Sequence, residues 1–278
     1  MCGIAGMVLS KKIRTADELE ALRKTFSTLV VATQIRGRDA TGGFVVSRKK
    51  GIRYHKSNLP ALEMVKTPMW WGLMDEIDNS TVAVIAHTRA ATQGSPEDNS
   101  NNHPIHIGNL VGVHNGIILN DDDIREECPF DAEVDSAAIF ALLDKNAAKH
   151  RLNTEDIART ANDLIGDFAI AVADSRRPNC VFIARDDGRP LVMAHDAPRG
   201  VLWLSSTAPI LRRVYAGNPT SLPAWSTARL TDKHGAGAVV KVTRFGAPIA
   251  PIESSSDRND ASTADLWTWL DSQPELND

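Results

Sequence analysis

Apolar and polar positions along the chain follow two spacings, one typical of strands and one typical of helices. Short runs rich in branched apolar residues predict buried strands over residues 4–9, 82–87 and 110–114. Leucine and phenylalanine side chains spaced three or four residues apart predict a helix over residues 17–34. The same criteria predict further strands over residues 44–46, 52–54, 168–173, 180–184, 191–194, 201–204, 228–230 and 238–242, and helices over residues 134–149 and 154–164, with short helices within 60–78.

The order of these elements favours an α+β fold. Predicted strands and helices occur in blocks and do not alternate one by one along the chain. That order is typical of a sandwich with antiparallel sheets, and it disfavours a doubly wound parallel sheet. Residues 36–43 and 90–104 are rich in glycine and polar residues, so we predict a turn and a loop there.

The composition changes near the end of the sequence. From Glu253 onward, serine, aspartate and asparagine dominate, which is typical of a flexible linker. We therefore predict one domain over residues 1–250 and a linker over residues 251–278 that carries a short apolar segment at 266–270. With Trp267 and Trp269, this segment is either a docking peptide or a short helix that folds back on its own domain.

Length, charge and cysteine content narrow the class of protein. The chain has 278 residues, enough for one large domain or two small ones, with 31 Lys and Arg against 35 Asp and Glu. This balance gives no indication of the basic face that nucleic-acid binding requires. No apolar run approaches the roughly 20 residues of a membrane span, and the start of the chain lacks the basic region of a signal peptide, so we expect a cytoplasmic protein. Three scattered cysteines predict neither a disulfide framework nor a paired-cysteine zinc site.

Cys2 is the main candidate for a nucleophile. If Met1 is removed, Cys2 becomes the N-terminal residue and carries both a thiol and a free α-amine. The amine, whose reference pKa is about 7.7–8.0, can accept the thiol proton directly or through a water molecule. The alternative is a buried structural cysteine on an N-terminal strand.

Asn115 and Gly116 follow the strand predicted at residues 110–114. A side-chain amide and a backbone N–H at one point are two donors suited to a developing oxyanion. The alternative is a hairpin turn, for which Asn-Gly is the strongest short sequence signal.

Arg89 and Asp135 are candidates for binding the two charged groups of a free amino acid. Arg89 follows a predicted strand, and its guanidinium suits bidentate binding of a carboxylate, to which Thr92 can add a hydroxyl. Asp135 opens a predicted helix, where a carboxylate can bind an α-ammonium group. The alternatives are a surface arginine in a solvated loop and a helix N-cap at Asp135.

These residues lie in segments that resemble the class II glutamine amidotransferase domain. That domain occurs in glucosamine-6-phosphate synthase, amidophosphoribosyltransferase, asparagine synthetase and glutamate synthase, and the resemblance is strongest to the first of these. The match extends from Cys2 to about Val242. Its main segments are Cys2-Gly-Ile-Ala-Gly6, Arg36-Gly-Arg-Asp-Ala-Thr-Gly42, His87-Thr-Arg-Ala-Ala-Thr-Gln-Gly94, Asn102-His-Pro104, His114-Asn-Gly-Ile-Ile-Leu-Asn120 and Val134-Asp-Ser136.

The resemblance implies a four-layer αββα sandwich of two antiparallel sheets, the N-terminal-nucleophile hydrolase fold. It implies Cys2 as the nucleophile with its own α-amine as the base, and the Asn115 side chain and Gly116 backbone N–H as the oxyanion hole. Among the remaining residues that match the family, Arg89, Thr92 and Asp135 would hold the backbone groups of glutamine, His103 would lie near the glutamine pocket, and Arg36 and Gly37 would lie on a loop that packs near the nucleophile.

Three features depart from the most similar branch. Ala90 replaces a bulky aromatic residue, and Gln93 replaces a histidine. The synthases also carry a second domain that uses the ammonia, whereas about 35 residues follow Val242 here, fewer than any acceptor domain needs. We therefore expect a separate ammonia-acceptor protein as the partner.

The predicted reaction is the hydrolysis of glutamine to glutamate and ammonia through a thioester on Cys2, with no cofactor and no metal. Two other hypotheses stay open at this point. In the first hypothesis, the chain is an amidase of the same fold that acts on another amide. In the second, it is a regulatory or binding homologue without catalysis. A metal site formed by His103, His106 and His114 matches no recognisable ligand spacing.

Overall fold

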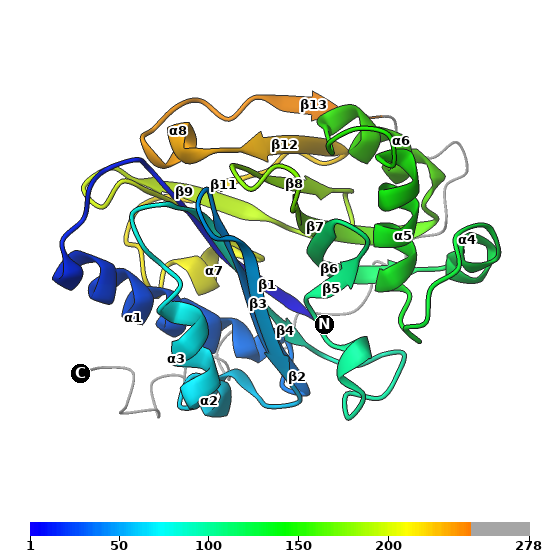
Figure 1. Cartoon of the computed structure of the whole chain (residues 1–278), viewed down its shortest axis with the longest axis horizontal. Coiled ribbons are helices and arrows are strands. Elements are labelled where there is room, and N and C mark those ends of the chain that lie inside the picture. Colours follow the sequence, from blue (N-terminus) through cyan, green and yellow to red (C-terminus); the bar gives the residue numbers. More distant parts are fainter. Residues whose placement is uncertain (246–278) are drawn as a thin grey trace. The chain divides into compact units, whose positions relative to one another are not determined.

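Two antiparallel sheets packed face to face form the centre of the fold (Figure 1). The computed structural model describes residues 1–245. The predicted linker and the apolar segment at residues 266–270 therefore lie outside the described residues. The domain boundary at residue 250 lies outside them as well, and it stays a prediction.

The first sheet has the strand order β11-β9-β10-β1-β4-β2-β3, and its neighbouring strands pair antiparallel. Its strands are β1 (Gly3–Leu9), β2 (Ala40–Ser47), β3 (Gly51–Ser57), β4 (Thr81–Arg89), β9 (Val192–Asp196), β10 (Val201–Ser205) and β11 (Thr220–Ser221). The N-terminal strand β1 thus lies inside the sheet, between β10 and β4.

The second sheet has the strand order β13-β12-β8-β7-β6-β5, and it is also antiparallel. Its strands are β5 (Ile105–Ile107), β6 (Leu110–Ile118), β7 (Gly166–Asp174), β8 (Val181–Arg185), β12 (Ser226–Leu230) and β13 (Val242–Arg244). The long pair of β6 and β7 is the part of this sheet that reaches the candidate site.

Helices cover the outer face of each sheet, which gives the four layers that the resemblance implies (Figure 1). The first sheet packs against α1 (Ala16–Thr33), α2 (Ala61–Met64), α3 (Pro68–Met74) and α7 (Ala208–Leu211). The second packs against α4 (Asp121–Glu127), α5 (Ser136–Asn146) and α6 (Thr154–Asp163). The short elements η1 (Gln34–Arg36), η2 (Asn99–Asn101) and α8 (Asp232–Gly235) complete the described part. The predicted α+β sandwich is confirmed.

The layer between the sheets is filled by alternate residues of the facing strands. Ile4 and Val8 of β1 and Val113 of β6 belong to this core. Since side chains along a strand point alternately to opposite faces, Cys2 and Asn115 continue these two rows toward one end of the layer. The strand alternation therefore brings the predicted nucleophile and the predicted oxyanion donor to the same end.

Local sequence explains why α1 begins where it does. Thr15 accepts a hydrogen bond from the backbone N–H of Glu18, and the Glu18 side chain accepts one from the backbone N–H of Thr15. This reciprocal arrangement satisfies two donors at the start of the helix. Along the helix, Leu22, Phe26 and Leu29 are buried against the first sheet, as their spacing predicts.

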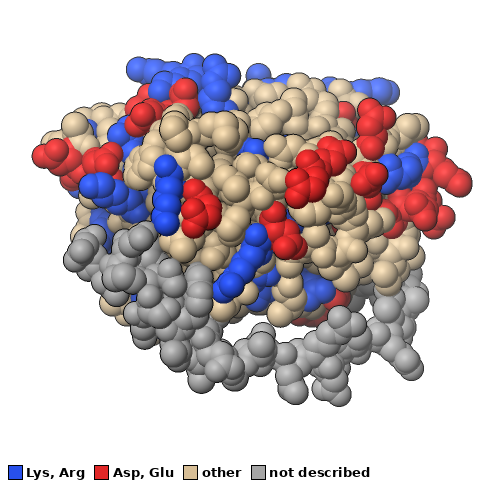
Figure 2. Space-filling view, turned by 90° about the horizontal axis from the view of Figure 1, so that it is seen from below, with Lys and Arg blue, Asp and Glu red and all other residues tan. Residues whose placement is uncertain are grey.

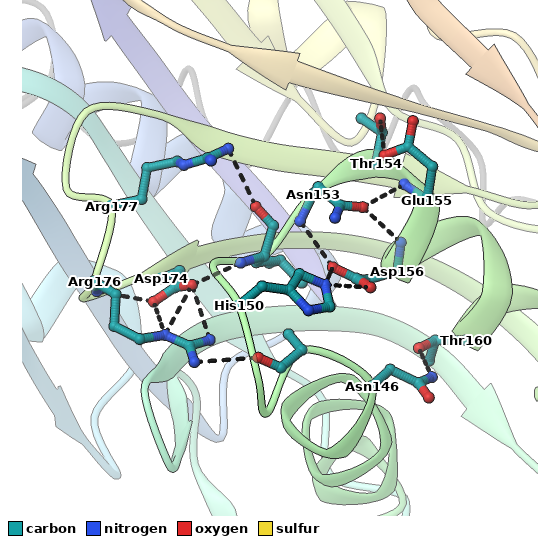
Figure 3. Close-up of polar contacts among 12 residues, drawn as sticks. Asn146, His150, Asn153, Thr154, Glu155, Asp156, Thr160, Asp174, Arg176 and Arg177 are labelled. Carbon is teal, nitrogen blue, oxygen red and sulfur yellow. Dashed lines mark hydrogen bonds and ion pairs between the residues drawn. The ribbon is translucent and has the colours of Figure 1, made fainter.

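A polar network fixes the turn between α5 and α6 to the end of β7 (Figure 3). Asp174 accepts hydrogen bonds from the backbone N–H of Leu152 at 2.8 Å and from Nε of Arg176 at 2.9 Å. Arg176 also donates to the carbonyl oxygen of Ala147 at 3.1 Å, and Asn153 caps α6 by accepting from two backbone N–H groups. The network holds α5, whose N-terminus reaches the candidate site, against the second sheet.

Three predictions about elements are wrong. The turn predicted at residues 36–43 contains the start of β2, which begins at Ala40. Within this strand, position 42 has room only for glycine, because the carbonyl oxygen of His103 passes so close that no side chain fits there. The strand predicted at 110–114 does not end before Asn115 but continues to Ile118, and the strand predicted at 238–242 is present only from Val242 onward.

The described residues show whether a helix could span a membrane and how charges are distributed on one face. No helix within residues 1–245 has the length and apolarity needed to cross a bilayer. On the face shown in Figure 2, Lys and Arg side chains are interspersed with Asp and Glu side chains. Charges of both signs therefore share the visible, described part of that face.

Candidate active site

Cys2 lies at the start of β1, at one end of the layer between the sheets. Its Sγ atom accepts a hydrogen bond from the backbone N–H of Ala90 at 3.3 Å. Ala90 follows the last residue of β4, and β4 pairs with β1 so that Gly3 is opposite Thr88. The sheet pairing therefore holds the thiol directly beside Arg89.

The chemical state of Cys2 depends on Met1. Burial raises the pKa of the Cys2 thiol, while the hydrogen bond from Ala90 and the charge of Arg89 act in the opposite direction. With Met1 attached, the nitrogen of Cys2 is part of an amide and cannot act as a base. Loss of Met1 converts this nitrogen into an amine on the same residue as the thiol.

Arg36, the last residue of η1, and the loop that follows it pack against the nucleophile and the end of β4. Nε of Arg36 donates a hydrogen bond to the carbonyl oxygen of Cys2 at 2.8 Å. At Gly37, a Cβ atom would collide with the backbone of Arg89 and Ala90. Only a residue without a side chain permits this approach, so the loop fixes both the backbone of Cys2 and the end of the strand beside it.

Asn115 and Gly116 lie inside β6 and not in a hairpin turn. They are opposite Ala169 and Phe168 of β7 in a continuous antiparallel register. Gly116 has a φ of 146°, and a Cβ atom there would collide with the carbonyl oxygen of Asp167. The hairpin alternative is therefore wrong, because pairing with β7 outweighs the local turn signal.

Ser206 joins the Asn115 side chain to the first sheet. Nδ2 of Asn115 donates to Oγ of Ser206 at 2.9 Å, and this oxygen also accepts from the backbone N–H of Ile4 at 2.7 Å. The serine thereby bridges the two sheets beside Cys2. Sequence reasoning missed it, and the only signal was a pair of serines that follow the apolar strand ending at Leu204.

His87 holds the backbone directly before Asn115. Its Nε2 atom lies 2.9 Å from the carbonyl oxygen of His114. A carbonyl oxygen can only accept, so Nε2 of His87 carries the proton. Nδ1 of His114 lies 2.8 Å from Oγ of Ser136, at the start of α5, and the ring of His103 packs against the ring of His87 in a tilted arrangement with centroids 4.1 Å apart. Contacts from β4 and α5 to β6 therefore fix the backbone of β6 next to Asn115.

His87, His103 and His114, which we call the buried histidines, are neutral at pH 7. Burial lowers the pKa of each, to about 3 for His87. His106 lies apart from them and contacts Tyr54, with Nδ1 3.3 Å from the hydroxyl oxygen. Within residues 1–245, no three His, Cys, Asp or Glu side chains come together in an arrangement suited to a metal ion.

Arg89 is buried at the end of β4, with 3% of its surface exposed, so the surface-loop alternative is wrong. Its Nη1 donates to Oδ1 of Asn102 at 2.7 Å, and its Nη2 donates to the carbonyl oxygens of Gln93 and Gly94. The guanidinium thus fixes the loop after β4. Thr92 lies exposed on that loop.

Asp135 caps α5 and also anchors the end of β6. Its Oδ1 accepts from the backbone N–H of Ser136 at 2.8 Å, and its Oδ2 accepts from the backbone N–H of Ile118 at 2.7 Å. The N-cap alternative is confirmed as one role of this residue. Oε1 of Gln93 accepts from the backbone N–H of Asp135 at 3.2 Å, while its Nε2 donates to Asp121 at 3.2 Å. Gln93 therefore links the loop after β4 to α5.

Most of the predicted site residues meet at this end of the sandwich. We call the loop after β4, which contains Gln93, the Gln93 loop. Direct contacts connect Cys2 with Arg36, Arg89 with the Gln93 loop, and that loop with Asp135. The arrangement combines a thiol, amide donors, a guanidinium and a carboxylate. These are the groups that attack on the side-chain amide of a free amino acid requires.

The sequence matches a known family over this same region. The family model described as "Glutamine amidotransferase domain" matches residues 87–213, which include Arg89, Asn115 and Asp135. The match begins within β4 and ends two residues after α7.

Two relatives illustrate the sequence similarity. 7-Cyano-7-deazaguanine synthase 2 of Sulfurisphaera tokodaii is 27% identical over 241 residues, which cover 84% of this chain and 49% of that protein. Glutamine–fructose-6-phosphate aminotransferase of Thermotoga maritima is 31% identical over 220 residues, which cover 76% of this chain and 33% of that protein. The chain thus spans half or less of the length of these relatives.

Solved structures share the fold. Glutamine phosphoribosylpyrophosphate amidotransferase from B. subtilis superposes with a TM-score of 0.63 at 17% identity, covering 88% of this chain and 49% of that one. A glutamine aminotransferase class-II domain protein from Silicibacter pomeroyi gives a TM-score of 0.54 at 13% identity, covering 75% of this chain and 92% of that one. The sandwich, the ordered motifs and the family match agree, and they identify the described part of the chain as a class II glutamine amidotransferase domain.

Proposed function

We propose that this domain hydrolyses glutamine to glutamate and ammonia, with the thiol of Cys2 as the nucleophile once Met1 has been removed. One observation carries the proposal. Sγ of Cys2 lies 3.3 Å from the backbone N–H of Ala90, beside Arg89 and at the same end of the inter-sheet layer as Asn115. A buried structural cysteine would not need these neighbours.

In the proposed reaction, the α-amine of Cys2 takes the thiol proton and the thiolate attacks the δ-carbonyl carbon of glutamine. The amine then passes the proton to the departing ammonia. Water hydrolyses the γ-glutamyl thioester, with the same amine as the base.

Asn115 and Gly116 are proposed to stabilise the oxyanion of each tetrahedral intermediate. Nδ2 of Asn115 carries two N–H groups, and Ser206 accepts one of them, so one is left for the oxyanion. Each donor of this kind contributes about 3–4 kcal/mol. Replacing Asn115 by alanine should therefore lower kcat by about 10²–10³-fold.

The charged groups of glutamine are proposed to bind at the two ends of the Gln93 loop. Arg89 and Thr92 would hold the α-carboxylate, and Asp135 would hold the α-ammonium. Arg89 and Asp135 are both buried, which strengthens their interaction with a charged ligand. His103 is proposed to border the pocket, while Arg36 and Gly37 keep the backbone of Cys2 in place.

We further propose that the ammonia is used by an acceptor outside residues 1–245, and that this acceptor is a separate cytoplasmic protein. The described residues form one sandwich, with the candidate site at one end of the layer between its two sheets. The relatives named above are at least twice as long as the region they share with this chain. Ammonia release measured with and without proteins encoded beside this one tests this part.

An assay of glutamate and ammonia release tests the nucleophile. Cys2→Ala should lose at least about 10³-fold in turnover. Cys180→Ala is the matched control, because Cys180 is a buried free thiol on the far side of the second sheet, and it should keep its turnover. Turnover of Cys2→Ala at the wild-type level would show that the thiol is not the nucleophile.

Two further measurements separate the rival functions. The mass of the purified protein reports whether Met1 has been removed, since a retained Met1 blocks the amine. A retained Met1 together with no glutamine hydrolysis would support a binding or regulatory homologue. Faster hydrolysis of acylated amines than of glutamine would support an amidase with another substrate.

A further inference from the structure

Lys56 is a half-buried lysine beside the candidate site, and the proposed reaction does not use it. It lies on β3 directly opposite Gly42 of β2. A Cβ atom at position 42 would collide with the Cβ atom of Lys56 and with the carbonyl oxygen of His103. The missing side chain thus lets the loop before β5 pack onto these strands, and the Lys56 ammonium donates to the carbonyl oxygen of Asn102 in that loop at 2.7 Å.

Asn102 connects Lys56 to Arg89. Its carbonyl oxygen accepts from Lys56, and its side-chain oxygen Oδ1 accepts from Nη1 of Arg89 at 2.7 Å. Nδ2 of the same amide donates to the carbonyl oxygen of Pro96 at 2.7 Å and to Oδ1 of Asn99 at 2.9 Å. Two cations are therefore held by one buried residue whose own position is fixed by its loop.

The oxygen atoms that accept hydrogen bonds from these two cations are all uncharged. Arg89 donates to the Asn102 amide and to the carbonyl oxygens of Gln93 and Gly94, and Lys56 donates to the Asn102 carbonyl. Within residues 1–245, no carboxylate forms an ion pair with either cation. Buried charges in proteins are normally paired, so two neighbouring cations without an anion indicate a place for a negatively charged ligand.

The two cations also repel each other. Burial and the charge of Arg89 lower the pKa of Lys56 to about 8, against the attraction of Asp98. The ammonium therefore stays mostly charged at pH 7, close enough to the guanidinium for the repulsion to be felt. An anion bound beside Arg89 would offset this repulsion.

We propose that Lys56 supplies a second positive charge to the subsite that binds the α-carboxylate of glutamine. This inference rests on the proposed function, which assigns that carboxylate to Arg89. A guanidinium has five N–H donors, and Arg89 uses three of them within the protein, so two remain for the carboxylate. Lys56 acts by its charge, and the subsite therefore favours free amino acids over amides that lack a carboxylate.

Calorimetry on a protein that cannot turn over glutamine tests the subsite directly. In the full-length Cys2→Ala protein, titration with L-glutamine gives Kd without hydrolysis. Lys56→Gln keeps an N–H donor for Asn102, and Lys56→Met keeps the length of the side chain, but both lose the charge. Each should raise Kd about three- to tenfold, the effect of one partly exposed charge near a charged ligand. Lys56→Arg keeps the charge and should stay within about twofold of the parent.

Steady-state kinetics with Cys2 intact separate this role from a structural one. KM for glutamine should rise by the same factor in Lys56→Gln while kcat stays unchanged, because the α-carboxylate is bound equally in the ground state and the transition state. Lys50→Met is the control. Lys50 pairs with Glu76 and Asp78 at the turn between β2 and β3, at the end of β2 away from Arg89. It removes the same charge and should leave Kd and KM as they are.

The outcomes separate this inference from the proposed function. Equal Kd values with Lys56 and with either neutral variant would overturn the inference and leave the proposed function standing. A Lys56→Arg protein that binds as weakly as Lys56→Gln would overturn it as well, since charge would then not be the cause, and so would an equal loss in Lys50→Met. If Cys2→Ala binds no glutamine and the wild type hydrolyses none, the proposed function fails and the inference with it.

Discussion

Replacing Asp135 by asparagine separates a structural role from a substrate-binding role. The carboxylate is 5% exposed and accepts two backbone hydrogen bonds, from Ser136 at 2.8 Å and from Ile118 at 2.7 Å. An asparagine has the same shape but only one accepting oxygen. Whichever way the amide turns, one of the two buried N–H groups faces an NH₂ group and loses its partner.

The size of the effect follows from these contacts. A buried donor left without a partner costs about 1–3 kcal/mol. Asparagine is as good an N-cap as aspartate, so the amide oxygen should turn toward Ser136 and leave Ile118 unpaired. We therefore expect the free energy of unfolding to fall by about 2 kcal/mol. If Asp135 also binds the α-ammonium of glutamine, kcat/KM should fall by more than about tenfold, since a hydrogen bond to a charged group contributes about 1.5–3 kcal/mol.

Urea unfolding and steady-state glutaminase kinetics on the same preparations provide both numbers. Asn153→Ala is the matched control, because Asn153 caps α6 in the same way but lies in the α5–α6 turn. It should lose about 0.5–2 kcal/mol of stability with no change in kcat/KM. An Asp135→Asn protein within about 0.5 kcal/mol of the wild type would refute the assigned hydrogen bonds. Lost stability with unchanged kcat/KM would refute the ammonium-binding role.

Three other predictions concern the same region. Lowering the pH from 6 to 5 should reduce the free energy of unfolding by at least about 1 kcal/mol in urea titrations, because His87 and His103, whose pKa values burial lowers far below the usual value, bind protons only when unfolded. Each of these two rings contributes about 1.4 kcal/mol per pH unit, Asp186, whose pKa burial raises to about 7, offsets one of them, and the lowered pKa of His114 acts in the same direction as the two rings. A flat profile would mean that these rings are accessible to water. Ser206→Ala leaves the Asn115 amide without its acceptor and should cost about 1–3 kcal/mol of stability by urea unfolding, together with a lower kcat; a normal kcat would show that Ser206 does not position Asn115. Gly37→Ala should cost about 1–3 kcal/mol in the same assay, because its Cβ meets the backbone of Arg89, and unchanged stability would contradict the close approach of that loop.

Elements that depend on local periodicity were predicted well. The helix at α1 and the strands β1, β4 and β7 lie within a few residues of their predicted ends. In each, the spacing of apolar side chains alone decides which face is buried. The elements that were missed, such as β5 and α4, are short and have few apolar positions.

Predictions failed where long-range pairing opposes a local signal. Asn115-Gly116 has the sequence of a hairpin turn, and Gly42-Gly43 has that of a loop, yet both lie in strands. Each dipeptide pairs with a neighbouring strand that is distant in the sequence, and each glycine faces backbone that leaves no room for a side chain. The turn that glycine content predicted at residues 36–43 is therefore wrong for Gly42 and Gly43.

Residue type and local spacing were enough to predict which chemical groups are available and on which elements they lie. These two criteria place Cys2 beside the first strand, Arg89 near the end of β4, Asn115 near the end of β6 and Asp135 at the start of α5. Three features could not be predicted in this way and became clear from the fold: the burial of Arg89, the anchoring of Ile118 by Asp135, and the bridge that Ser206 forms between the two sheets. The reason is physical: burial and hydrogen-bond partners across a sandwich depend on which strands pair and in what register, and that is decided by contacts between residues far apart along the chain.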